Sequence, residues 1–196
     1  FKSKNLYNAT LYAVRQHFFK TEKFINYYSL QSIFQNSQQY DYYALPAKVS
    51  QQTMKMVNQN FKSFFEALKS YKKDPSKFTG RPKLPKYLNK DNGRYLLAFT
   101  NQAVSRKILK EQKLIKLSGL DLVIPTDITY ENLNQVRIAK RLDSYVIEII
   151  YTVNELPAKD DNNRYASVDL GINNLATVVS NTTGSYIING RPLKSI

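Results

Sequence analysis

The sequence predicts an α+β chain in which helices come first and antiparallel strands follow. Apolar residues recur at helical spacing in residues 1–75 and at alternating positions in residues 76–156. Short strand-like runs between turn residues then reappear in residues 164–196. We therefore expect three domains over these ranges: an amino-terminal helical bundle, a small antiparallel β-barrel, and a meander of three strands.

The helices are predicted from apolar stripes. One stripe at helical spacing is formed by Tyr7, Leu11, Val14 and Phe18. A second, shorter helix is expected over residues 26–34. The clearest stripe is formed by Met54, Val57, Phe61, Phe64 and Leu68. This last helix is expected to begin at Pro46, where a missing N–H costs nothing, and to end near Asp74, because Pro75 disfavours helical geometry before it.

The strands of the middle region are predicted from alternating apolar residues between turn residues. Four such runs cover residues 94–105, 113–125, 134–142 and 144–153. Several short strands in so few residues are typical of a small barrel or sandwich. Six cations lie within or beside the runs: Lys110, Lys113, Lys116, Arg137, Lys140 and Arg141. They could form a phosphate-contacting face or a solvated outer face, and the sequence leaves both open.

The composition points to an anionic partner. The chain has 29 Lys and Arg against 15 Asp and Glu, a formal net charge of +14. Such an excess is typical of proteins that bind nucleic acid or an anionic membrane surface, although an ordinary basic soluble protein also fits. No apolar run approaches the roughly 20 residues that a membrane span needs. The absence of cysteine excludes thiolate zinc sites in this chain, and the single histidine, His17, makes a histidine metal site improbable.

A long basic segment follows the clearest helix. Nine cations lie between Lys62 and Lys90, opposed only by Glu66 and Asp74. Aromatic residues are interleaved with the cations, as in surfaces that bind a sugar-phosphate backbone and stack on bases. A solvated linker is the alternative.

A single carboxylate, Asp169, stands near the end of the first strand of the last segment, just before Gly171. A meander with an acid on its first strand opens the RNase H-like nuclease fold, in which two divalent metal ions act together. Mg²⁺ prefers oxygen ligands of this kind, but one carboxylate cannot hold two ions, so further acids are needed. The same pattern also resembles the first phosphate-binding strand of actin-like and chaperone ATPases, and an ordinary turn acid is a third reading.

Longer motifs favour the first reading. The stretch "SVDLGINNLATVVSN", followed by "NGRPLKSI", resembles the start of the RuvC-like nuclease region in TnpB proteins. These proteins are transposon-encoded relatives of type V CRISPR effectors and are often labelled OrfB-type transposases. Upstream, "KNLYNATLYAVRQ" is similar to the family's first helix, "LPAKVSQQTMKMVNQNFKSFFEAL" to its recognition-lobe helix, and "SYVIEIIYTVNE" to the strand before the nuclease region.

The resemblance implies a cytoplasmic RNA-guided DNA endonuclease whose partners are a guide RNA from the transposon end and target double-stranded DNA. Residues 1–75 would then be a recognition-type lobe, 76–156 an OB-like wedge barrel, and 164–196 the start of a RuvC-like domain. Asp169 would be the first catalytic acid and a ligand of Mg²⁺. The nucleic-acid contacts expected on this basis are Lys55, Lys62, Lys69, Lys77, Arg81, Lys83, Lys86 and Tyr87.

The chain also departs from the family. The family has a further strand before "KNLYNAT" and continues beyond Ile196 to a second acid, a cysteine zinc ribbon and a third acid. We therefore expect a partial chain that cannot cut DNA by itself, with zinc bound only in the missing region. A non-catalytic RNA- or DNA-binding derivative, accessory or repressor-like, is the alternative function. A fragment of an actin-like ATPase, which would bind Mg-ATP, is a weaker one.

Overall fold

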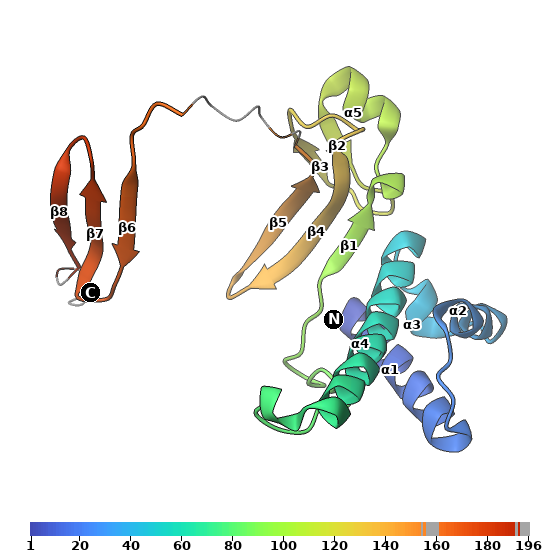
Figure 1. Cartoon of the computed structure of the whole chain (residues 1–196). Helices are drawn as coiled ribbons and strands as arrows, with labels where there is room; N and C mark the ends of the chain where they lie inside the picture. The colour runs from blue at the N-terminus through green and yellow to red at the C-terminus, as the bar shows by residue number, and fades with distance from the viewer. Residues whose placement is uncertain (154, 156–160, 191, 193–196) are drawn as a thin grey trace. The chain divides into compact units, whose positions relative to one another are not determined.

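The computed structural model describes residues 1–153, 155, 161–190 and 192. The chain divides into two compact units, residues 1–153 and 154–196, which are described separately below (Figure 1). Arg191 and residues 193–196, which belong to the "NGRPLKSI" motif, lie outside the described residues. The predicted α+β class is confirmed, with helices first and antiparallel sheets after them.

The first unit begins with helices α1 (Lys2–Thr21), α2 (Tyr27–Asn36), α3 (Tyr40–Tyr43) and α4 (Ala47–Lys73). Three of the four residues of the predicted α1 stripe, Tyr7, Leu11 and Val14, are buried, whereas Phe18 is only half-buried; Leu6, outside the predicted stripe, is fully buried as well. Helix α2 begins where the Asn26 side chain accepts a hydrogen bond from the Ser29 N–H at 3.0 Å, a typical N-cap. The short α3 was not predicted, because four residues are too few to show a period.

Helix α4 joins two hydrophobic cores. Its central residues Met54, Val57 and Phe61 pack into the helical core with residues of α1 and α2. One turn earlier, Val49 packs into a second core formed mainly by the β region. The helix begins after Pro46 and ends at Lys73, as predicted, and the 3-10 turn η1 (Pro75–Lys77) follows it.

The β region of the first unit contains two antiparallel sheets. The larger has the order β1-β4-β5 and is formed by β1 (Leu97–Thr100), β4 (Leu133–Arg141) and β5 (Ser144–Tyr151). The smaller pairs β2 (Leu114–Lys116) with β3 (Val123–Pro125). The antiparallel pairing is confirmed, but among the described residues the strands do not close into one hydrogen-bonded barrel; an isolated bridge from Val104 to Leu117 links the two parts.

Two short helical segments interrupt the predicted strands. The turn η2 (Asn101–Ala103) ends the first run, and helix α5 (Arg106–Gln112) fills the gap before β2. Ser105 caps α5 by accepting from the Ile108 N–H, and Lys113 ends it in a left-handed conformation. Between β2 and β3, Gly119 has φ +75, and a Cβ there would lie 2.9 Å from Pro46 Cγ. Glycine therefore lets this turn approach the start of α4.

The second unit is a three-stranded antiparallel meander, as predicted. Its strands are β6 (Ala166–Leu170), β7 (Asn174–Ser180) and β8 (Gly184–Asn189), in the order β6-β7-β8. Ala176 and Val178 of the central strand are buried, whereas every residue of β6 and β8 is exposed. The apolar side chains Val168 and Leu170 of β6 therefore face solvent in this unit as it is described. No helix in the described part of either unit is long and apolar enough to cross a membrane.

Candidate nucleic-acid interface

Helix α4 carries a row of lysines on the side opposite its buried face. Lys55, Lys62 and Lys69 are spaced by seven residues, which places them on one stripe about 10.5 Å apart along the helix axis. All three are exposed, and none forms an ion pair within the part of the chain that the structure describes. The Lys55 ammonium lies 5.2 Å from the centre of the Tyr27 ring. We call these three residues the lysine row.

The basic loop, residues 77–90, is anchored to α1 and is not a solvated linker. The Asn8 side chain donates to the Leu88 carbonyl at 2.8 Å and accepts from the Leu88 N–H at 2.9 Å. The Lys4 ammonium donates to the Lys90 carbonyl at 2.6 Å. Leu84 and Leu88 also pack against the helical core. The loop therefore presents its remaining side chains from a fixed backbone.

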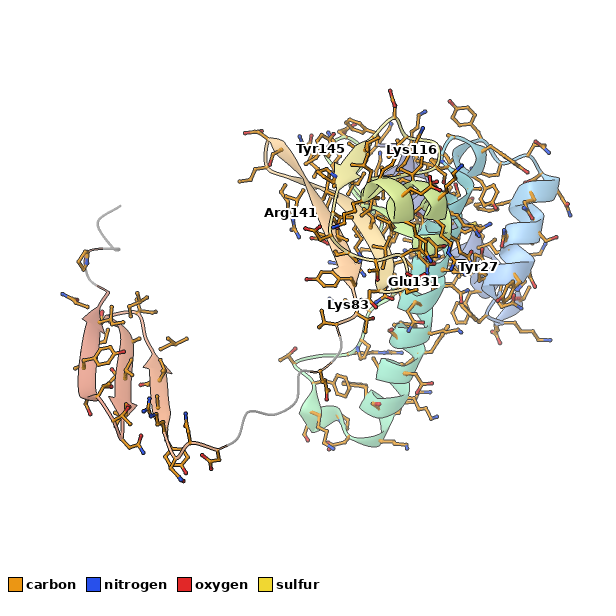
Figure 2. The ribbon with its side chains drawn as sticks, turned by 90° about the horizontal axis from the view of Figure 1, so that it is seen from above. Tyr27, Lys83, Lys116, Glu131, Arg141 and Tyr145 are labelled. Carbon is orange, nitrogen blue, oxygen red and sulfur yellow. The ribbon has the colours of Figure 1, made fainter. Side chains whose placement is uncertain are left out.

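Four predicted cations of this loop point into solvent: Lys77, Arg81, Lys83 and Lys86. Lys77 pairs with Asp74 at 3.4 Å, and a hydrogen bond from the Ser76 hydroxyl holds the pKa of the Asp74 carboxyl below its usual value. The other three make no ion pair among the described residues. Figure 2 labels Lys83 in this loop. Most of the predicted contact cations are thus available to an anionic partner.

Tyr87 is held in place by an arginine that the sequence reasoning missed. The Arg15 guanidinium of α1 lies 5.1 Å from the centre of the Tyr87 ring and 5.7 Å from that of Phe19. Tyr87 is 44% exposed. An aromatic ring braced by a cation and open on its other side can stack on a base. Arg15 lies on the same helical stripe as Lys4 and Asn8. This polar stripe beside the apolar stripe of α1 was the only signal in the sequence that could have indicated the contact with the loop.

The cations beside the smaller sheet are largely neutralised. Glu131 binds the Lys110 ammonium at 2.6 Å and the Arg106 guanidinium at 3.4 Å. The hydrogen bond from Lys110 is the main reason that the pKa of the Glu131 carboxyl lies below its usual value. Lys113 likewise pairs with Asp127 at 3.0 Å. The sequence left open whether the cations of these strands form a phosphate-contacting face or a solvated outer face. The ion pairs of Lys110 and Lys113 favour the solvated outer face for these residues.

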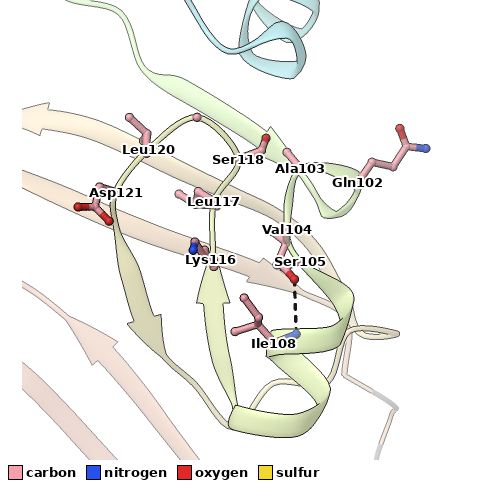
Figure 3. Close-up of a pocket in the computed structure, with 11 residues that line it drawn as sticks. Gln102, Ala103, Val104, Ser105, Ile108, Lys116, Leu117, Ser118, Leu120 and Asp121 are labelled. Atoms are coloured by element: carbon pink, nitrogen blue, oxygen red, sulfur yellow. Dashed lines mark hydrogen bonds between the residues drawn. The ribbon is translucent and has the colours of Figure 1, made fainter.

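Several hollows are lined by residues of the β region, and two of them bear on the site. One, of about 660 Å³, is formed by the β2–β3 turn and the η2–α5 segment, and its charged rim residues Lys116 and Asp121 offset each other (Figure 3). The other, of about 150 Å³, lies between α4 and the larger sheet and is lined by Gln52, Gln135 and Arg137 among others. The Arg137 Nε donates to the Gln135 side-chain oxygen at 2.7 Å. Amide and guanidinium groups in such a groove suit hydrogen bonding to base edges.

Asp169 does not form a metal site with the other described residues. It lies on β6 opposite Thr177 of β7, and its side chain is exposed. Within the described residues, no group of three or more His, Cys, Asp or Glu side chains could hold a metal ion together. The residues that the structure describes therefore do not fit the two-metal centre expected from the resemblance, and we derive no cleavage step from them.

The charge of the chain is divided unevenly. Residues 1–153 carry 25 of the 29 Lys and Arg and 11 of the 15 Asp and Glu, so the whole formal excess of 14 belongs to the first unit. Within that unit, residues 24–47 hold a single charged side chain, Asp41. The cations therefore gather on α1, α4, the basic loop and the β region, and not on α2 or α3.

Comparison with known proteins supports the resemblance at one end of the chain. Residues 148–196 match the OrfB_IS605 family, described as "Probable transposase". This match confirms, for that segment, the recognition of an OrfB-type (TnpB) sequence. A solved chain from a "Cryo-EM structure of CRISPR-Cas12f Ternary Complex" is similar with a TM-score of 0.38 and 10% identity, over 98% of this chain and 47% of that chain. This chain thus spans about half the length of that one. No curated protein matches the sequence.

Proposed function

Since residues 148–196 carry the sequence of the probable transposase family, we propose that this chain is the nucleic-acid-binding part of a TnpB-like, RNA-guided DNA endonuclease. Its partners are then a guide RNA from the transposon end and target double-stranded DNA. Helices α1–α4 serve as the recognition-type lobe, the two antiparallel sheets as the wedge-type region, and β6–β8 as the first strands of a RuvC-like domain.

The observation that carries the proposal is the lysine row of α4, which forms no ion pair among the described residues, together with an anchored basic loop. Lys55, Lys62 and Lys69 repeat at about 10.5 Å, so each can reach a different phosphate group. The loop adds Lys83 and Lys86 from a backbone fixed by Asn8. Because the backbone that carries both sets of side chains is already held before a partner arrives, binding loses less conformational entropy than it would with a mobile linker.

The groove between α4 and the larger sheet offers a means of reading bases. Gln52 comes from α4, and Gln135 and Arg137 come from β4. Glutamine can bond to two groups of adenine, and arginine to two groups of guanine, at the major-groove edge. We assign this groove to duplex DNA and the lysine row to phosphates of RNA or DNA.

Asp169 keeps its proposed role as the first metal-binding carboxylate of the nuclease site. It would need further carboxylates around it to hold Mg²⁺, and the described residues do not supply them. Nucleic-acid binding by the first unit does not depend on Asp169, so Asp169→Asn is expected to leave the affinity for RNA unchanged.

The test is a comparison of two structured RNAs of equal length, one from the adjacent transposon end and one unrelated, titrated with the whole chain at several salt concentrations. A preference for the transposon-end RNA, with affinity that falls steeply as salt rises, supports guide binding. Equal and weak affinity for both RNAs would contradict it.

A further inference from the structure

The β4–β5 hairpin extends past the sheet that supports it. Strand β1 pairs with β4 only from Gln135 to Ile138, whereas β4 and β5 remain paired with each other up to Arg141 and Ser144. Residues 139–146 are thus a two-stranded ribbon whose outer end is free of a third strand among the described residues. Figure 1 shows the end of this hairpin leading away from β1, and Figure 2 labels Arg141 and Tyr145 near it.

The turn at the end of the ribbon holds a leucine in an unfavourable setting. Arg141 and Ser144 are partners, so Leu142 and Asp143 form a two-residue turn. Leu142 has φ +48 and is 93% exposed. Turns of this length usually place Asn, Asp or Gly at positions with positive φ, because other side chains are strained there. The fold gains little burial from Leu142, so its apolar side chain is accessible to a partner.

The paired residues next to the turn include two cations and an aromatic ring, while the turn itself also contains the acid Asp143. The Lys140 ammonium lies 5.5 Å from the centre of the Tyr145 ring, which is 70% exposed. Arg141 is adjacent, and its guanidinium is 3.9 Å from Glu148, a distance that leaves it free to move toward a stronger anion. The tip thus has an apolar side chain that follows two cations, with Asp143 as the acid of the turn, and it suits a partner that has charged edges and an apolar interior.

Base-paired nucleic acid is such a partner. A groove of a duplex admits a two-stranded ribbon, and apolar side chains inserted between neighbouring base pairs unstack them. We propose that Leu142 is a wedge that enters a base step of duplex DNA while Lys140 and Arg141 bind the phosphates beside it. The inference rests on the proposed function, in which pairing of a guide begins with local opening of a DNA duplex.

The test uses the whole chain and a duplex that contains the fluorescent base analogue 2-aminopurine at its centre, in one DNA form and one RNA form. Unstacking raises the fluorescence of the analogue. We expect the wild-type chain to raise it and Leu142→Asn to abolish the rise, with an affinity lower by about tenfold because one apolar contact is lost. Leu142→Met, which keeps an apolar side chain, should retain the rise.

Three controls make the result decisive. Asn tolerates the left-handed conformation, so Leu142→Asn should melt at the same temperature as the wild type or higher, which excludes unfolding as the cause of a loss. Ile33→Asn changes an exposed aliphatic residue of α2 and should change neither signal. The rise is expected with the DNA form, and a rise with the RNA form alone would contradict the assignment to DNA.

Two outcomes would overturn the wedge. One is binding of either duplex with no Leu142-dependent rise, which leaves the proposed function intact. The other is that the chain binds phosphatidylserine vesicles but no duplex, and that Leu142→Asn abolishes the binding to vesicles. Failure of the chain to bind any nucleic acid, in contrast, would remove the proposed function itself.

Discussion

At the scale of single residues, Asn8 is the side chain that fixes the basic loop to the helical core. Its amide makes two hydrogen bonds with the backbone of Leu88, 80 residues away in the sequence. A side chain that satisfies both a carbonyl and an N–H orients the loop as well as holding it. The positions of Lys86 and Tyr87 beside it depend on this pair of bonds.

Replacing Asn8 should therefore weaken both folding and binding. Asn8→Ala leaves two backbone groups without their partner, and we expect a loss of about 1–3 kcal/mol of stability. RNA affinity should fall as well, because the loop is no longer held in one position. Asn5→Ala, an exposed position on the same helix, is the matched control for thermal unfolding and RNA titration. Equal behaviour of the two variants would show that the loop is held by other contacts.

Tyr95 makes the stability of the first unit sensitive to alkaline pH. Burial, and the neighbouring Tyr7 ring at 4.8 Å, raise the pKa of Tyr95 from its ordinary value of 10.0 to about 12. A raised pKa means that the fold favours the neutral phenol, so this contribution to stability is complete below pH 10 and is lost as pH rises toward 12.

We predict that the free energy of unfolding of Tyr95→Phe falls less than that of the wild type as the pH rises from 10 to 12. Denaturant unfolding at a series of pH values measures this directly. Tyr28→Phe, at an exposed position, should follow the wild-type profile. An identical profile for Tyr95→Phe would show that this phenol ionises as freely as it does in the unfolded chain.

At the scale of elements, α4 has two separate tasks on its two sides. Its inner side carries Phe61, which is fully buried and lies 6.1 Å from Phe24 and 6.2 Å from Phe65, measured between ring centres. Its outer side carries the lysine row. Substitutions on the two sides should therefore separate stability from binding.

Phe61→Ala is expected to reduce stability by about 3–5 kcal/mol, since it leaves a large cavity in the helical core. Met56→Ala, at a position that is 42% exposed, should change stability by less than about 1 kcal/mol. Urea unfolding of both variants measures the difference. A small loss for Phe61→Ala would mean that the core around α4 can collapse and refill the space.

The elements also show what could be predicted from the sequence. The stripes of α1 and α4, the paired runs of β4 and β5 and the meander were predictable because each repeats its period several times. Helix α5 was not, since seven residues between two strand-like runs carry too little of a pattern. Barrel closure depends on pairing between distant strands, and neither alternation nor turn residues specify that pairing.

The candidate site was predictable in part. Every predicted cation of the lysine row and the basic loop is exposed, because charged residues opposite an apolar stripe face solvent. The roles of Asn8 and Arg15 were missed, as they depend on a loop about 80 residues away folding back onto α1. The ion pairs of Glu131 were equally out of reach, since they join α5 to a segment that follows β3.

At the scale of the whole molecule, charge and motif belong to different units. The entire formal excess of 14 lies in residues 1–153, whereas residues 154–196 carry four Lys and Arg and four Asp and Glu. Phosphate binding should therefore be a property of the first unit. The second unit contributes Asp169 and most of the segment that matches the transposase family.

The most direct test of this account is the salt dependence of RNA binding by the whole chain, compared between two triple variants. One replaces Lys55, Lys62 and Lys69 by Ala, and the other replaces Arg106, Lys110 and Lys113, which are already paired with acids. The slope of log affinity against log salt is negative, and each lost phosphate contact makes it less steep by about 0.7–0.9. The account predicts a slope that is less steep than that of the wild type by about 2–3 for the first variant and by less than about 1 for the second. Equal changes, or an unchanged slope in the first variant, would contradict it.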